Sequence, residues 1–194
     1  MADKLLEIKD LEVLYKSGKN PVHAVNGISL TLNKGETLGL VGETGAGKTT
    51  TALAILRLLP ERTGCINQGQ ILFEGRDLLT LSEEEMRTQI RGEKISMIFQ
   101  DPMTSLNPVA TVGDQIAEAI IYHSNGQKVS QEQIDQRVGE VLEMVGIPAA
   151  RKNEYPHQFS GGMKQRVVIA MALSCQPERK CSPFPSSGGA DASC

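Results

Sequence analysis

The sequence has no tryptophan, and aromatic side chains make up only 4% of its 194 residues. Stacking surfaces for bases or sugars are therefore expected to be few, and core packing must rest on aliphatic residues and methionine. Lysine and arginine number 20 against 23 acidic residues, which gives a formal net charge of -3. This balance excludes a broad basic surface, so we expect no nucleic-acid partner, and any bound anion requires a local site.

Long apolar runs and paired cysteines are also missing. The opening stretch MADKLLEIKD has no apolar segment behind a basic one, and no later stretch approaches the ~20 apolar residues that span a bilayer. We therefore expect neither a signal peptide nor a transmembrane segment. The cysteines form no C-x-x-C pair and only three histidines are present, so free thiols are expected and a structural zinc site is not.

The sequence does contain an orderly succession of strand and helix patterns. Residues 5–15 and 27–33 alternate apolar and polar side chains, which is typical of half-buried antiparallel strands, and KSGKNP between them predicts a turn. Residues 36–42 predict a compact apolar strand. Residues 48–59 predict a helix, because they contain strong helix formers and no breaker before Pro60.

The middle of the chain predicts two short strands followed by helices. GQILFEG and ISMIFQ, residues 69–75 and 95–100, are the strands. Ser82 and Glu85, between them, have the spacing of a capping box, and Leu81 and Met86 that of a hydrophobic staple. Residues 111–146 are helical in pattern, with a cap at Ser130, a stop at Gly146 and Pro148, and one apolar face made of Ile134, Val138, Val141, Leu142 and Val145. We expect a helical subdomain inserted in an α/β core.

GETGAGKT, residues 42–49, matches the phosphate-loop pattern G-x-x-x-x-G-K-[ST] between an expected strand and an expected helix. Glycines let successive backbone N–H groups face a phosphate, and the helix N-terminus adds its dipole. Lys48 would reach the β and γ phosphates, Thr49 would coordinate Mg²⁺, and Thr50 could bind a further phosphate oxygen. The alternative is a glycine-rich turn that begins a helix and binds no ligand. The expected nucleotide-binding residues here are Gly42, Glu43, Thr44, Gly45, Ala46, Gly47, Lys48, Thr49 and Thr50.

FSGGMKQR, residues 159–166, resembles the LSGGQ-type signature of ABC transporter ATPases, and it lies downstream of a helical insertion as in that family. Ser160 can cap a helix that begins with two glycines, so the exposed N–H groups can approach a phosphate. The resemblance implies that ATP lies between two head-to-tail ATPase subunits, as a homodimer or heterodimer. The residues implied to bind the partner's ATP are Ser160, Gly161, Gly162 and Met163.

Three further residues take their interpretation from this resemblance. Gln100, in IFQDP, matches the Q-loop glutamine, which implies contact with Mg²⁺ and the attacking water; otherwise it is a polar residue at a strand end. Tyr15 resembles the aromatic residue that stacks on adenine, or it is an amphipathic lid over the core. His157 precedes the signature, so it is not the family's switch histidine, and we expect it to pack in a loop.

Residues 100–120 and 147–173 resemble the ATP-binding subunits of the oligopeptide, dipeptide and nickel importer group, and the similarity extends from residue 5 to about 177. It implies an α/β fold: a P-loop NTPase core with an N-terminal antiparallel β subdomain and an inserted α-helical subdomain. ATP and Mg²⁺ are the implied cofactors. The implied partners are integral membrane permease subunits and, indirectly, an extracytoplasmic substrate-binding protein. The implied location is peripheral, on the cytoplasmic face of the bacterial inner membrane.

After residue 177 the family pattern stops. The family continues into an apolar strand that ends in Asp-Glu, on which hydrolysis depends, but here ERKCSPFPSSGGADASC follows. Asp191 has no strand before it and no glutamate after it, so no Mg²⁺ role is transferred to it.

We expect a partial ABC ATPase domain at 1–177, with its helical subdomain at about 103–173, and a disordered or aberrant tail at 178–194. The expected function is the energy-coupling ATPase of a peptide or nickel importer. The alternatives are a hydrolysis-dead nucleotide-binding fragment, a non-functional truncated or frameshifted product, and a soluble ABC ATPase without a permease.

Overall fold

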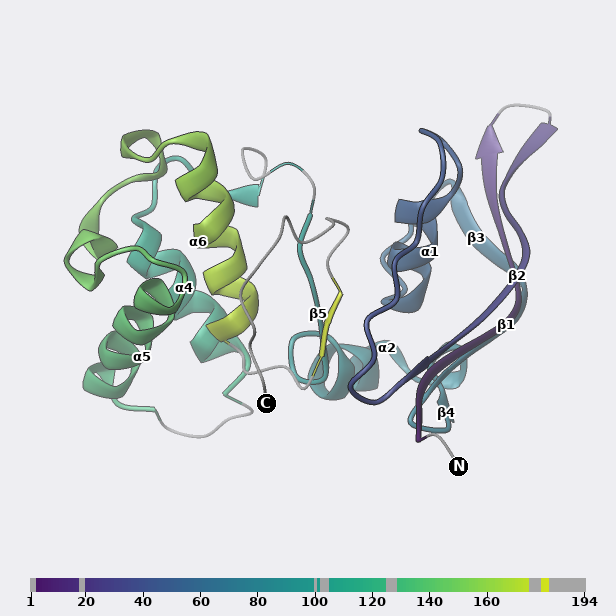
Figure 1. The fold of residues 1–194 in the computed structure, drawn as a ribbon, viewed down its shortest axis with the longest axis horizontal. Helices are drawn as coiled ribbons and strands as arrows, with labels where there is room; N and C mark the ends of the chain where they lie inside the picture. Colours follow the sequence, from purple (N-terminus) through teal and green to yellow (C-terminus); the bar gives the residue numbers. More distant parts are fainter. Residues whose placement is uncertain are drawn as a thin grey trace. The chain divides into compact units, whose positions relative to one another are not determined.

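The computed structural model describes residues 3–17, 20–99, 101, 105–124, 129–174 and 179–181. Contacts between these residues divide the chain into two compact units, and the division falls between Met86 and Arg87. The first unit contains an antiparallel sheet and helix α1, and the second contains three longer helices and a short parallel sheet (Figure 1).

The sheet of the first unit has the order β2-β1-β3-β4, and all of its pairs are antiparallel. Its strands are β1 (Lys4–Ser17), β2 (Asn20–Asn33), β3 (Gly64–Phe73) and β4 (Arg76–Asp77). The predicted strands are present but longer, and the centre of the turn expected at 16–21, residues 18–19, lies outside the described residues. Lys16 pairs with Pro21 and Ser17 with Asn20, because the β1–β2 ladder continues through most of that segment.

Residues 36–43 have no regular secondary structure, so the strand expected over 36–42 is wrong. A strand needs a neighbour to pair its backbone groups, and in the described part of the chain no strand pairs with this segment. Its apolar side chains consequently lie open: Leu38 is 46%, Leu40 47% and Val41 91% exposed.

Helix α1 (Lys48–Ile55) follows the phosphate loop and ends four residues earlier than expected. Its end is a Schellman motif, in which the Arg57 N–H donates to the Ala54 carbonyl and the Leu58 N–H to the Leu53 carbonyl. Arg57 adopts the left-handed conformation, with φ of 52°, where glycine is usual. An arginine in this position is not a recognisable signal for the end of a helix, so the sequence predicted a helix that is too long at its C-terminal end.

The capping box predicted at Ser82 and Glu85 is confirmed. It begins α2 (Glu83–Glu85), which follows a 3₁₀ turn, η1 (Leu78–Thr80), and continues into a π-helical turn, η2 (Met86–Ile90). Leu81 and Met86 are 7% and 0% exposed. The predicted staple pair is therefore buried on both sides of the cap.

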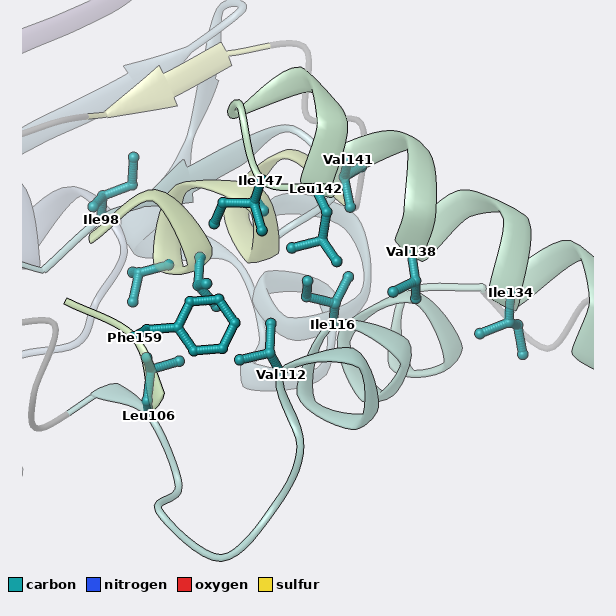
Figure 2. Packing of buried hydrophobic residues seen from close by; sticks show 13 residues of the cluster. Ile98, Leu106, Val112, Ile116, Ile134, Val138, Val141, Leu142, Ile147 and Phe159 are labelled. Carbon is teal, nitrogen blue, oxygen red and sulfur yellow. The ribbon is translucent and has the colours of Figure 1, made fainter. Parts of the chain in front are cut away.

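The second unit is built around three helices, α4 (Val112–Tyr122), α5 (Gln131–Met144) and α6 (Gly161–Ser174). The 3₁₀ turns η3 (Ala149–Asn153) and η4 (Pro156–Gln158) connect α5 to α6. Both predicted ends of α5 are confirmed: Ser130 forms a capping box with Gln133, and Gly146, with φ of 73°, follows the last turn. Apolar side chains from all three helices form one core, which includes Ile116, Val138, Leu142, Phe159 and Val167 (Figure 2).

A short parallel sheet accompanies these helices. Strand β5 (Ile95–Met97) is shorter than the expected strand 95–100 and pairs with β6 (Arg179–Cys181). Residues 179–181, which belong to the segment expected to be a disordered or aberrant tail, therefore form a strand. Parallel pairing uses backbone groups alone, so this segment forms a ladder without an apolar run. The remainder of the 178–194 segment lies outside the described residues.

In the part of the chain that the structure describes, no helix has both the length and the apolar character needed to cross a bilayer. Within the same residues, no group of three or more His, Cys, Asp or Glu side chains is arranged to hold a metal ion.

Candidate functional site

The phosphate loop, residues 42–49, turns into α1 through two glycines in the left-handed conformation. Gly45 has φ of 86°, and Gly47, the N-cap of α1, has φ of 82°. Gly47 lies directly on β2: a Cβ atom there would be 2.3 Å from the Ala24 carbonyl oxygen and 3.3 Å from the Val25 side chain. This close approach admits only glycine and fixes the beginning of α1 against the sheet.

The side chain of Lys48 folds back across the loop. Its Nζ donates hydrogen bonds to the Gly42 and Glu43 carbonyls, each at 2.7 Å. The Ala46 N–H donates to the same Glu43 carbonyl at 3.2 Å, which closes the turn. The ammonium group is therefore located at the loop and not in the surrounding solvent.

The first turn of α1 presents hydroxyl groups with different surroundings. Thr49 is exposed and Thr50 half-buried, whereas Thr51 is 4% exposed and donates its hydroxyl to the Gly47 carbonyl at 3.0 Å. The Tyr15 hydroxyl lies 3.5 Å from Thr50 Oγ1. The tyrosine singled out by the sequence is thus brought to the helix that begins at the phosphate loop.

These groups fit a nucleoside triphosphate with Mg²⁺. No side chain caps α1, so its first backbone N–H groups and the positive end of its dipole are available to an anion. Lys48 adds a positive charge at the loop, with a third proton beyond its two bonds to carbonyls, and the exposed Thr49 hydroxyl is an oxygen ligand of the kind that Mg²⁺ accepts. Lys48 and Thr49 are among the residues expected from the sequence to bind phosphate and Mg²⁺, and that role stays a prediction.

The signature residues form the beginning of α6. Ser160 Oγ accepts a hydrogen bond from the Met163 N–H at 3.4 Å, and the Lys164 N–H donates to the Ser160 carbonyl at 2.9 Å. Ser160, Gly161 and Gly162 are exposed, and a Cβ atom at either glycine would meet nothing within 4 Å. The backbone of this turn is therefore open to approach by another molecule.

One residue beside the signature was not found from the sequence. Arg151, in η3, forms an ion pair with Glu154 and places its guanidinium 4.5 Å from the centre of the Phe159 ring. The guanidinium lowers the pKa of the Glu154 carboxyl below its ordinary value. An arginine and a glutamate three residues apart on a helical turn would have been the available signal.

Two other residues were given an interpretation from the sequence. Gln100 lies outside the described residues. His157 is exposed, and its ring stacks on Tyr155 with centroids 5.8 Å apart, as expected of a residue that packs within a loop. The sequence contains no Asp-Glu pair, so the two hydrolytic carboxylates have no counterpart in these 194 residues.

The chain is similar in sequence to curated transport ATP-binding proteins. The chain is 50% identical over 185 residues to the oligopeptide transport ATP-binding protein OppD of Bacillus subtilis, which covers 94% of this chain and 51% of that protein. It is 49% identical to the dipeptide transport ATP-binding protein DppD of the same organism, over 91% of this chain and 52% of that protein. The chain therefore spans about half the length of these relatives.

A solved structure of similar fold is the dimeric, post-hydrolysis state of the ATP-binding cassette MJ0796 bound to ADP and phosphate. Its TM-score is 0.79 at 28% identity, over 92% of this chain and 73% of that one. The family described as ABC transporter matches residues 25–179, which include both the phosphate loop and the signature. On these matches and on the geometry of the phosphate loop, the chain belongs to the ABC transporter family.

Proposed function

We propose that this chain is the ATP-binding, energy-coupling part of an ABC importer for peptides. The observation that carries the proposal is the phosphate loop, in which Gly47 fixes the start of α1 on the sheet and Lys48 lies folded over the loop. The relatives at about half identity are named as oligopeptide and dipeptide transport proteins, and this supports peptides as the cargo over nickel.

In this proposal the described residues bind and orient the nucleotide. The first N–H groups of α1 and the Lys48 ammonium bind the phosphates, and the Thr49 hydroxyl contributes to the Mg²⁺ site together with Gln100. Bound Mg²⁺ would neutralise charge on the phosphate oxygens. Tyr15 lies beside the base in this proposal, which its contact with Thr50 near the start of α1 supports.

The exposed glycines at the start of α6 supply the other half of the site. Because Gly161 and Gly162 leave the backbone open, the signature turn can approach the phosphates bound by a second ATPase subunit in a head-to-tail dimer. Permease subunits in the bacterial inner membrane are the proposed partners, with the ATPase on the cytoplasmic face. An extracytoplasmic substrate-binding protein would deliver the peptide to the permease.

A second candidate is a module that binds ATP without hydrolysing it. It is favoured by the segment 36–43, whose apolar side chains lie open where a strand was expected. Binding and hydrolysis use different groups, so ATP binding does not require hydrolysis.

Both candidates are tested on the 194-residue polypeptide by equilibrium binding of labelled ATP with Mg²⁺ and by steady-state phosphate release. We expect Lys48→Ala to weaken ATP binding by about tenfold or more, because a hydrogen bond to a charged group is lost. Lys34→Ala, an exposed lysine in the same unit that pairs with Asp3, is the control and should bind as the wild type does.

Equal binding by wild type and Lys48→Ala would refute a nucleotide site at the phosphate loop. We expect phosphate release at the background rate. Release by the wild type that disappears in Lys48→Ala would instead exclude the non-hydrolysing candidate.

A further inference from the structure

The signature turn is weakly fixed by its own cap. The hydrogen bond from the Met163 N–H to Ser160 Oγ is long, at 3.4 Å, and Gly161 and Gly162 contribute no side chain to hold the backbone. Two consecutive glycines at a helix start also carry a large conformational entropy, which favours fraying. A turn that must present its N–H groups in one geometry therefore needs support from outside α6.

Arg151 provides this support from the preceding 3₁₀ turn. Its Nη2 donates to the Gln158 carbonyl at 3.3 Å, and its Nη1 lies 3.5 Å from the Met163 sulfur. The guanidinium plane also covers the Phe159 ring, which is 4% exposed and part of the helical core (Figure 2). One side chain thus contacts residues on both sides of Ser160.

Glu154 holds the guanidinium in this orientation. Its carboxylate accepts two hydrogen bonds from Arg151 Nε, at 2.9 and 3.0 Å, and one from Nη2 at 2.6 Å. The Glu154 main chain is fixed in turn, because its carbonyl accepts a hydrogen bond from the Val112 N–H at the start of α4. The arginine is therefore anchored to a different helix from the one it supports.

An ordinary surface ion pair would not show this arrangement. Exposed pairs contribute little and leave the charged heads in solvent. The Arg151 side chain is only 30% exposed, and all three of its nitrogens point to protein atoms. Arg137 forms the same kind of pair with Glu140 three residues later, in α5, and its side chain is 24% exposed, but its further hydrogen bond goes to the Leu173 carbonyl near the end of α6, at 3.5 Å.

We propose that Arg151 is a positioning residue that holds the signature turn, residues 159–163, in the conformation that receives the partner subunit's nucleotide. The second half of this statement rests on the proposed function. The first half, that Arg151 orders the turn, is independent of it and can be tested separately.

The first test is amide hydrogen exchange of the full chain, read at the peptide that covers residues 159–164. Arg151→Met should raise the exchange rate there by about tenfold, the change expected from loss of one charge-assisted hydrogen bond. Arg137→Met is the matched control and should leave that peptide unchanged. Arg151→Lys keeps the charge but cannot contact both sides of Ser160, so it should give an intermediate rate.

Unchanged exchange at 159–164 in Arg151→Met would overturn the proposal. A uniform increase through α4, α5 and α6 would also overturn it, because it would show a general loss of stability. If Arg151→Met does not fold, Arg151→Lys decides by the same readout.

The second test is association of the chain at saturating ATP and Mg²⁺, measured by sedimentation velocity. Arg151→Met should raise the dimer dissociation constant at least about tenfold, and Arg137→Met should not change it. Equal association of Arg151→Met and wild type would overturn the link between the ordered turn and the partner's nucleotide. Absence of association in the wild type would count against the proposed dimer, while the exchange result would still decide whether Arg151 orders the turn.

Discussion

Replacement of Gly47 by alanine tests whether the phosphate loop depends on its close approach to β2. The Cβ atom of an alanine there would be 2.3 Å from the Ala24 carbonyl oxygen. Carbon and oxygen in a close contact are usually about 3.3 Å apart or more. The obstacle is backbone, and Val25, the next residue, is paired with Val13 in the β1–β2 ladder. Either the ladder or the loop must shift by about an ångström to relieve the overlap.

The free energy of this change can be separated into two parts. An alanine at left-handed φ costs about 1–2 kcal/mol, and the smaller entropy of the unfolded chain offsets about 0.4–1 kcal/mol of it. Overpacking adds about 1–3 kcal/mol. Gly45 has nearly the same φ, 86° against 82°, but a Cβ atom there would meet nothing within 4 Å. Gly45→Ala therefore has the cost of alanine at left-handed φ but not the cost of overpacking.

The assay is urea unfolding of the two variants, followed by circular dichroism, together with ATP binding. We expect Gly47→Ala to lower the free energy of unfolding by about 1–3 kcal/mol more than Gly45→Ala does. Equal destabilisation by the two variants would refute the argument, because it would show that backbone conformation alone, and not contact with β2, makes glycine necessary at residue 47.

Two further predictions concern helix starts. Ser130→Ala removes the capping box of α5 and should lower the free energy of unfolding by about 1 kcal/mol, measured by urea unfolding; no change would mean that packing alone fixes that end. Hydrogen bonds, first from the Ser82 main chain and then from its side chain, lower the pKa of Glu85. Its stabilisation should be complete above about pH 5 and lost as the pH falls through the lowered pKa, so the difference in melting temperature between wild type and Glu85→Ala should shrink in acid. A difference in melting temperature that grows in acid would contradict the predicted direction of the pH dependence.

Local signals in the sequence predicted local structure well. The capping boxes at Ser82 and Ser130 and the glycine stop at Gly146 are present in the structure, because each depends on residues within one turn of the helix. The alternation in 5–15 and 27–33 likewise predicted strands, and β1 buries Ile8, Leu11 and Val13 although its register shifts between Ile8 and Leu11. The phosphate-loop pattern predicted a glycine turn before a helix, and Gly45 and Gly47 form that turn at the start of α1.

Features that depend on distant partners could not be read in this way. The segment 36–42 has the composition of a strand, but a strand forms only when another strand pairs with it. The end of α1 depends on Arg57 in a conformation that its residue type does not signal. Arg151 was overlooked because its importance comes from contacts with Gln158 and Met163, seven and twelve residues away.

The segment before the phosphate loop and the helix after it differ in how they are held by the rest of the unit. The expected strand before the loop is unpaired, yet the loop itself is fixed from its far side by Gly47 on β2, by Thr51 on the Gly47 carbonyl, and by Tyr15 beside Thr50. All of these contacts lie within the antiparallel unit. The proposed phosphate contacts therefore depend on the antiparallel sheet, whereas the family resemblance implies that the carboxylates of hydrolysis follow a different, apolar strand. Nucleotide binding and hydrolysis therefore depend on different parts of the fold. Substitutions at Gly47 or Lys48 should weaken ATP binding whether or not the chain hydrolyses ATP.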